Sequence, residues 1–297
     1  MTGRTRGHAG KDNRPGPPGV TRVRLSGMEH TLALPHGLLS WQESGSRDAK
    51  PAIVLLHGFP HDRALWQEQL ASHADSLPGT RLLVPDLPGF GGSTPLADAD
   101  MDGYADVVAA MLDEAGIERV VIAGLSMGGY VAFAFWRRYA VRVQALILLD
   151  TKATADTDAA RAKRRELITT VEADGVGAIV PALLTQQLGA TTRSGPPALV
   201  SHVEMMLRRS PASGVIAAAH ALMQRPDSTP TLDTITVPTL VLVGEEDTVT
   251  PLSDAIAVQS GIRGSRLVTV PGAGHLSPLE QPAIVNAAIA EFLDVVT

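Results

Sequence analysis

The sequence contains no cysteine, and only 4% of its 297 residues are aromatic. The lack of cysteine excludes disulfides and cysteine-based metal centres, and it leaves the redox compartment undetermined. The few aromatic rings argue against a large stacking platform for ligands.

An excess of basic residues is also missing, because the formal net charge is −6. Nucleic-acid binding needs a basic face, so we expect no nucleic-acid partner. No run of about 18 apolar residues occurs, so we expect no membrane span. No zinc-type histidine motif occurs either. His57 and His61 are four apart, but Gly58-Phe59-Pro60 between them breaks any helix that would align them, and we expect no metal.

The first 20 residues are basic and rich in glycine and proline. They lack the apolar stretch of about 7–15 residues that a secretory signal needs. We therefore expect residues 1–27 to be a disordered or non-native extension, with Met28 as an alternative start, and the protein to be cytoplasmic.

Hydrophobic residues make up 44% of the chain, and much of this content falls in short continuous runs that alternate with helical patterns. Continuous apolar strands between helices predict an α/β fold, with a mostly parallel central sheet covered by helices on both faces. The predicted strands are 30–34 and 38–43 as an opening antiparallel pair, then 52–56, 81–84, 119–123, 145–149, 239–243 and 266–270. The predicted helices of this part are 65–74, 102–115, 127–139, 253–259 and 283–293.

The alternation stops at Asp150, after the sixth strand, and no convincing strand follows until residue 237. The pattern predicts a helical cap over 151–236, inserted into a core formed by 28–150 and 237–297. Its predicted helices are 158–173, 176–188, 198–209 and 212–224. Methionine often lines adaptable binding surfaces, so candidate pocket residues are Met205, Met206 and Met223, together with Trp66 near a motif; core packing is the alternative for each.

Ser126 stands in the run Gly124-Leu125-Ser126-Met127-Gly128, between a predicted strand and a predicted helix. A serine with glycine two residues before and after it, at a strand-to-helix turn, is typical of a nucleophile elbow. The turn is too tight for bulky neighbours, and it lifts the hydroxyl above the sheet edge. The following helix directs its N-terminal N–H groups at the reacting oxygen.

A serine hydroxyl needs a base, and the base needs an orienting acid. Asp247 and His275 each follow a later predicted strand, so the order Ser126, Asp247, His275 is that of a hydrolase triad. Alternatives for the acid are Glu245 and Glu246 in the same loop, and Asp150 after the sixth strand. Asp86 is better explained as a buried carboxylate that accepts backbone N–H bonds in a glycine-rich turn.

Acyl transfer also needs donors for the negative oxygen of the tetrahedral intermediate. Two backbone N–H groups are candidates: that of Met127 after the nucleophile, and that of Phe59 in the loop after the strand 52–56. Pro60 has no N–H, so Gly58 is the only alternative to Phe59 in that loop.

Five motifs together resemble the α/β-hydrolase superfamily: His57-Gly58-Phe59-Pro60, Asp86-Leu87-Pro88-Gly89-Phe90-Gly91-Gly92-Ser93, Gly124-Leu125-Ser126-Met127-Gly128-Gly129, Gly244-Glu245-Glu246-Asp247 and Gly274-His275. Within it, the chain is most similar to small bacterial carboxylesterases and to enol-lactone and acyl-homoserine-lactone lactonases. The resemblance implies the α/β-hydrolase fold with a helical cap, and acyl transfer without a cofactor. It assigns catalysis to Ser126, Asp247 and His275. Ser126 argues against relatives that use an aspartate nucleophile.

These observations predict a serine hydrolase that cleaves carboxylic esters or lactones of small to medium hydrophobic acyl groups through an acyl-enzyme. A cofactor-free haloperoxidase or perhydrolase, and a slow-turnover ligand sensor that keeps the triad, are the alternatives. The sequence leaves the natural substrate, the ester or lactone preference, the chain length and the oligomeric state open.

Overall fold

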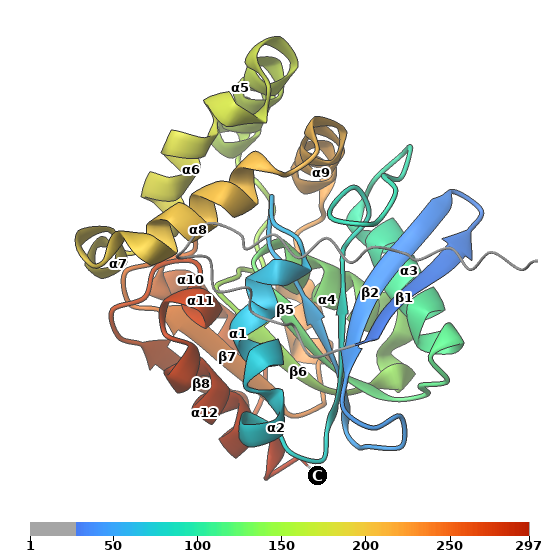
Figure 1. The fold of residues 1–297 in the computed structure, drawn as a ribbon. Coiled ribbons are helices and arrows are strands. Elements are labelled where there is room, and N and C mark those ends of the chain that lie inside the picture. The colour runs from blue at the N-terminus through green and yellow to red at the C-terminus, as the bar shows by residue number, and fades with distance from the viewer. Residues whose placement is uncertain (1–27, 297) are drawn as a thin grey trace, which may run out of the picture.

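The computed structural model describes residues 28–296, which form one eight-stranded sheet flanked by helices (Figure 1). The strand order is β1-β2-β4-β3-β5-β6-β7-β8. The β1–β2 and β2–β4 pairs are antiparallel and the others are parallel. The strands are β1 (Met28–Leu34), β2 (Gly37–Ser44), β3 (Ala52–Leu56), β4 (Arg81–Pro85), β5 (Val120–Leu125), β6 (Val143–Leu149), β7 (Thr239–Gly244) and β8 (Arg266–Val270).

The central strands are buried on both faces. Every residue of β3, β4, β5 and β7 is buried, which is why these strands are continuous apolar runs rather than alternating ones. In the register, Leu125 at the end of β5 pairs with Leu149 at the end of β6. The carboxyl ends of the parallel strands therefore meet at one edge of the sheet, where open α/β sheets place their ligands.

Helices cover both faces of this sheet. Figure 1 shows α1, α2, α11 and α12 in front of it and α3 and α4 behind it. The helices of this part are η1 (Arg63–Trp66), α1 (Gln67–Ala71), α2 (His73–Ser76), α3 (Met101–Glu114), α4 (Met127–Tyr139), η2 (Ala140–Arg142), α10 (Leu252–Gly261), α11 (Ser277–Glu280) and α12 (Pro282–Leu293).

Between β6 and β7 the chain forms helices without a strand, and five of them, α5 to α9, occupy the upper part of Figure 1. We call residues 151–236 the cap. Its helices are α5 (Asp158–Asp174), η3 (Val176–Ala178), α6 (Val180–Gln187), α7 (Ala190–Ser194), α8 (Pro197–Arg208), α9 (Ala212–Gln224) and η4 (Thr229–Thr234). The α/β-hydrolase architecture predicted from the sequence is confirmed, whereas the division of the chain into a core and a cap remains a proposal.

The structure differs from the sequence prediction in a few elements. The predicted helix 65–74 is three short pieces, η1, α1 and α2. The break between α1 and α2 falls at Ser72, whose hydroxyl donates to the Glu68 carbonyl at 2.7 Å. Helices α7 and α11 were not predicted. Each is a single short turn, and α11 contains Pro278. The expectation for residues 1–27 lies outside the described residues.

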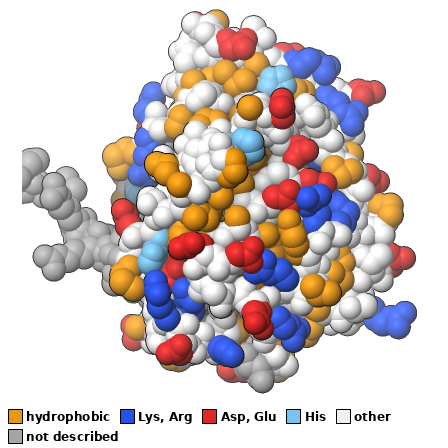
Figure 2. Space-filling model, turned by 90° about the vertical axis from the view of Figure 1, so that its right-hand side faces the viewer, with side chains coloured by type: hydrophobic (Ala, Val, Ile, Leu, Met, Phe, Trp, Pro, Cys, Tyr) orange, Lys and Arg blue, Asp and Glu red, His pale blue; other side chains and the backbone are white. Residues whose placement is uncertain are grey.

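Two surface observations bear on partners. Among residues 28–296, no helix is long and apolar enough to cross a membrane. On the face in Figure 2, acidic and basic side chains are interspersed, so no field of one sign covers that face.

Candidate active site

Ser126 occupies a sharp turn between β5 and α4. Its backbone lies at φ 53° and ψ −111°, a conformation that costs energy for a residue with a side chain. The glycines around it are sterically required. A Cβ on Gly124 would lie 2.3 Å from the Gly128 carbonyl oxygen, and one on Gly128 would lie 2.2 Å from that of Leu56. The elbow predicted from the sequence is therefore present in the fold.

Three side chains from the ends of different strands meet at this turn. The Ser126 Oγ lies 2.8 Å from Nε2 of His275, whose Nδ1 lies 2.8 Å from Oδ2 of Asp247. Ser126 is 9% exposed and His275 2% exposed, so both are shielded from bulk water. The arrangement has the nucleophile–base–acid geometry that acyl transfer requires.

Asp247 is held in place by its own loop. Its Oδ1 accepts the N–H groups of Val249 and Thr250 at 2.8 and 3.0 Å, and its Oδ2 accepts the Thr250 hydroxyl at 2.7 Å. Burial alone would raise the pKa of Asp247, but the neighbouring His275 and the Thr250 hydrogen bonds lower it below its ordinary value. The carboxylate therefore stays ionised and can fix the imidazole.

The interaction that lowers the pKa of Asp247 raises the pKa of His275. Burial would lower the pKa of His275, but the charge and hydrogen bond of Asp247, with smaller contributions from Asp150 and Glu280, raise it above its ordinary value. A neutral ring that donates from Nδ1 to Asp247 presents an unprotonated Nε2 to the Ser126 hydroxyl.

The alternative acids considered in the sequence analysis form hydrogen bonds with groups other than the His275 ring. Asp150, at φ 45°, accepts the Gly244 N–H at 2.8 Å and is 2.5 Å from the Ser277 hydroxyl. Burial, reinforced by the charge of Asp247, raises the pKa of Asp150 to about 8. Glu246 accepts two hydrogen bonds from Thr191 of the cap, and no contact joins Glu245 to His275 within residues 28–296.

Asp86 has the structural role that its sequence context suggests. It is fully buried, and it accepts the Arg63 and Gly92 N–H groups at 2.9 and 2.8 Å. It also forms an ion pair with the Arg63 guanidinium at 3.2 Å. These contacts tie the glycine-rich turn to η1, away from the reacting atoms.

The two candidate oxyanion donors stand beside the nucleophile. Phe59 and Met127 line the same cavity as Ser126. Gly58 lies against the elbow, because a Cβ there would be 3.3 Å from the Ser126 Cβ. Among residues 28–296, neither the Phe59 nor the Met127 N–H donates a hydrogen bond. Both donors thus remain free for a substrate oxygen.

His57 and His61 turn to different partners. The Nε2 of His57 accepts the Leu87 N–H at 2.8 Å, whereas the Nε2 of His61 lies 2.9 Å from the Gln187 Oε1. Burial lowers the pKa of His61 to about 4, so its ring is neutral. In the described part of the chain, no three metal-ligating side chains gather into a group.

The cavity above Ser126 has a volume of about 680 Å³. Its walls combine apolar side chains with charged ones, and both core and cap contribute. Core residues are Phe59, Ser126, Met127, Tyr130, Thr248, Val249 and His275; cap residues are Lys152, Asp156, Ala160, Lys163, Arg164, Glu166, Leu167, Thr170, Ile179, Ala182, Leu183, Gln186, Gln187 and Leu222.

None of the four pocket candidates chosen from the sequence lines this cavity. Trp66 is fully buried where η1 packs against β3 and β4. On α8, Met206 is 1% exposed in the apolar core, whereas Met205 is 62% exposed on the other side of the helix. Met223 is half-buried, and the neighbouring Leu222 faces the cavity instead.

The sequence contained a better signal for the cavity wall. Six cavity residues of α5, at positions 160, 163, 164, 166, 167 and 170, recur at spacings of three and four residues and so share one helix face. This face includes Lys163 and Arg164. The lining therefore combines charged with apolar side chains, and the small to medium hydrophobic acyl group expected from the sequence stays a prediction.

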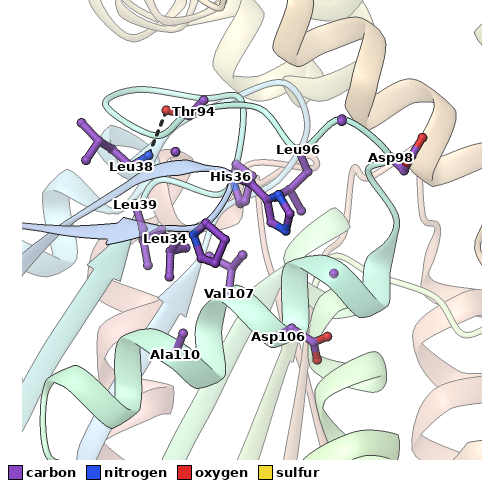
Figure 3. A pocket seen from close by; sticks show the side chains of 15 residues that line it. Leu34, His36, Leu38, Leu39, Thr94, Leu96, Asp98, Asp106, Val107 and Ala110 are labelled. Atoms are coloured by element: carbon purple, nitrogen blue, oxygen red, sulfur yellow. Dashed lines mark hydrogen bonds between the residues drawn. The ribbon is translucent and has the colours of Figure 1, made fainter.

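A second cavity, of about 380 Å³, lies between the β1–β2 turn and α3 (Figure 3). Leu34, Leu39 and Val107 form its apolar wall, and Thr94 accepts the Leu38 N–H there at 3.0 Å. It shares no lining residue with the cavity above Ser126.

Comparison with known proteins agrees with this geometry. The family model described as the alpha/beta hydrolase family matches residues 53–288, so the chain belongs to that family and is a hydrolase. It is 29% identical over 244 residues to 3-oxoadipate enol-lactonase 1 of Acinetobacter baylyi, covering 82% of this chain and 88% of that protein.

Two further proteins are similar over most of their length. The AB hydrolase superfamily protein YisY of Bacillus subtilis is 31% identical over 251 residues, covering 81% of this chain and 90% of that protein. The structure of a thermophilic esterase from Thermogutta terrifontis superposes with a TM-score of 0.84 at 36% identity, covering 91% of this chain and 99% of that one.

Proposed function

We propose that the protein is a serine hydrolase that cleaves carboxylic esters or lactones of small to medium size through an acyl-enzyme. The observation that carries this proposal is the hydrogen-bonded series Ser126–His275–Asp247, with 2.8 Å at each step. Nε2 of His275 takes the Ser126 proton while Oγ attacks the carbonyl carbon. The protonated ring then gives that proton to the leaving alcohol oxygen.

Deacylation repeats these steps with water. His275 removes a proton from water, the resulting hydroxide attacks the acyl carbon, and Ser126 leaves with the proton. In both halves the carbonyl oxygen becomes negative and accepts the N–H groups of Phe59 and Met127. One such donor is worth about 3 kcal/mol of transition-state stabilisation. The steps use side chains, backbone groups and water only.

The cavity narrows the substrate class. Leu167, Leu183 and Val249 offer apolar contact to the acyl or alcohol portion, while the volume of about 680 Å³ suits small to medium substrates. The lining also contains three cations, Lys152, Lys163 and Arg164, against two carboxylates, Asp156 and Glu166. Arg164 pairs with Asp156, so a small excess of positive charge remains and neutral or anionic substrates fit better than cationic ones. The Acinetobacter relative is named a lactonase and the Thermogutta neighbour an esterase, which supports testing both bond types.

The test compares wild type with Ser126→Ala on p-nitrophenyl acetate, p-nitrophenyl butyrate and a lactone panel. Because Ser126 forms the covalent bond, we expect kcat to fall by about 10⁴-fold or more. A fluorophosphonate should add its mass to wild type at Ser126 and not to the variant. Ser253→Ala, an exposed serine on α10, is the matched control and should retain full activity.

Three outcomes would contradict the proposal. Undiminished turnover by Ser126→Ala would exclude this nucleophile. Peroxide-dependent halogenation that exceeds ester hydrolysis would favour a haloperoxidase, and a single turnover with retained acyl group would favour a ligand sensor.

A further inference from the structure

The contacts between the cap and the loop of His275 have no role in the proposed reaction steps. Residues 187–192, at the end of α6 and the start of α7, lie against the loop of His275 with backbone next to backbone. A Cβ on Gly274 would lie 2.3 Å from the Gly189 nitrogen, and one on Gly189 would lie 2.8 Å from the Gly274 nitrogen. Glycine on both sides allows this approach, so the two segments are packed as one unit.

Gln187 connects both halves of the catalytic centre. Its backbone carbonyl accepts the His275 N–H at 2.8 Å. Its side-chain Nε2 donates to the Phe59 carbonyl at 2.9 Å, in the loop of the proposed oxyanion donor. Its Oε1 lies 2.9 Å from Nε2 of His61. Gln187 is only 4% exposed, so a change that removes these bonds leaves buried polar groups without partners.

Glu280 of α11 joins the same two segments from the other side. Its Oε1 accepts the N–H groups of Gly274 and Leu276, the two neighbours of His275, at 2.9 and 3.1 Å. Its Oε2 accepts the Gly189 N–H at 2.8 Å and the Thr192 hydroxyl at 2.6 Å. One buried carboxylate thus receives four hydrogen bonds, two from the catalytic loop and two from the cap.

We propose that Gln187 and Glu280 are positioning residues, which hold the His275 loop and the Phe59 loop in their reactive arrangement through residues 187–192 of the cap. This inference rests on the proposed hydrolase function. Neither residue touches the reacting carbonyl in the proposed mechanism. A displacement of about 1 Å between nucleophile, base and oxyanion donors can cost about 100-fold in rate, so such contacts affect catalysis without binding substrate.

Glu280→Gln and Gln187→Met test the proposal. The amide of Glu280→Gln has one acceptor oxygen, so at least two of the four donors lose their partner. Gln187→Met keeps the length of the side chain and removes its bonds to Phe59 and His61. For each variant we expect kcat on a good ester to fall by about 10- to 100-fold while KM changes by less than about threefold.

Matched controls carry the same chemical change in the cap. Glu204→Gln removes a carboxylate that pairs with Arg208 on α8, and Gln224→Met changes an exposed residue of α9. Both should retain wild-type kcat, and both report any general effect on folding through Tm.

The pH profile separates positioning from a purely structural role. The charged or titratable groups that act on His275 are Asp247, Asp150, Glu280 and, more weakly, His61. Hydrolysis needs neutral His275, so kcat/KM falls as the pH drops through the pKa of His275, which lies above its ordinary value. Removing the Glu280 charge lowers the pKa of His275. The acid limb of Glu280→Gln should therefore move to lower pH, and that of Glu204→Gln should not.

The outcomes distinguish this inference from the function on which it rests. Wild type that neither hydrolyses esters or lactones nor reacts with a fluorophosphonate contradicts the proposed function. Active wild type together with kcat within about twofold of the controls in Gln187→Met, or a change confined to KM, overturns the positioning roles. Should Glu280→Gln fail to fold, Gln187→Met alone decides by the same criterion.

Discussion

The core and the cap hold their structure in different ways. In the core, every residue of β5 and β7 is buried. β5 ends at Leu125, directly before Ser126, and β7 ends at Gly244, just before the loop of Asp247. In the cap, the 17-residue helix α5 buries only Ile168 and Val171. The reacting atoms are thus attached to a rigid apolar frame, and the cavity walls to a helix that is largely solvated.

Polar contacts add to the small apolar burial of α5 where the cap meets α4. Asp156 binds Arg164 at 2.5 Å and Arg225 at 2.6 Å, and the Arg225 guanidinium lies over the Tyr130 ring at 4.1 Å from its centre. Tyr130 belongs to α4, so this cluster fastens the cap to the helix of the nucleophile. From this difference in burial we expect core substitutions to change kcat and the free energy of unfolding, and most cap substitutions to change substrate binding.

The largest effect is expected from a substitution of one of the two buried carboxyls near His275 in the core. Asp247 lies against the imidazole, and its pKa is lowered, whereas burial raises the pKa of Asp150 to about 8 and its carboxyl contacts Gly244 and Ser277 instead. Asp247→Asn removes the acceptor that fixes the His275 tautomer, and we expect kcat to fall by about 10⁴-fold at pH 7.

Asp150→Asn is the matched control for that experiment. An amide can accept from Gly244 and donate to Ser277, and asparagine tolerates the positive φ of 45°. We expect kcat to stay within about tenfold of wild type. Equal losses in the two variants would mean that both carboxyls act on the imidazole, which would contradict the separate roles assigned here.

The core was largely predictable from the sequence because each of its features has a local cause. The continuous apolar strand before Ser126 and the glycines on either side of it indicate the elbow without any long-range information. Asp247 and His275 could be placed because parallel strands end at the same edge of the sheet. Their partner Thr250 was missed, although an Asp followed three residues later by a hydroxyl is a local turn pattern.

The cap could be predicted as helical but not in its contacts. Met205, Met206 and Met223 were chosen by residue type, and type does not fix the direction in which a helical side chain points. The cavity face of α5 was detectable by periodicity, but the sequence gives no orientation of that face toward Ser126. Gln187 was missed because its side-chain partners Phe59 and His61 lie 128 and 126 residues away. Glu280 has local partners, Gly274 and Leu276, but its bonds to Gly189 and Thr192 of the cap span 91 and 88 residues.

A pair of glycine substitutions, one in the core and one in the cap, compares how tightly the two regions are packed, and we expect effects of intermediate size. In the core, a Cβ on Gly128 would lie 2.2 Å from the Leu56 carbonyl oxygen, which is backbone and cannot move aside. In the cap, a Cβ on Gly177 would meet only the flexible end of Arg208, at 3.3 Å. Gly128→Ala should therefore lower the free energy of unfolding by about 1–3 kcal/mol, or more.

Gly177→Ala should be neutral or raise the free energy of unfolding by up to about 1 kcal/mol, since alanine restricts the unfolded chain. Urea unfolding followed by circular dichroism measures both. Equal destabilisation of the two variants would show that the cap is packed as tightly as the core, against the contrast drawn above.

The smallest effect concerns the charge of the cavity wall. Lys152 and Lys163 line the cavity, and no carboxylate of residues 28–296 lies within 4 Å of either ammonium. Lys152 moderates the pKa of Asp254, which burial raises, so part of its charge is already balanced. An exposed charge pair is worth about 0.2–1 kcal/mol. Lys152→Met should therefore raise KM for a negatively charged succinate monoester by about 1.4- to 5-fold, with little change for the neutral p-nitrophenyl butyrate.

Lys50→Met, the same change at an exposed residue that does not line this cavity, controls for net charge. An equal change for both esters would mean that Lys152 shapes the wall by packing, and the cap would then act on binding through volume rather than charge.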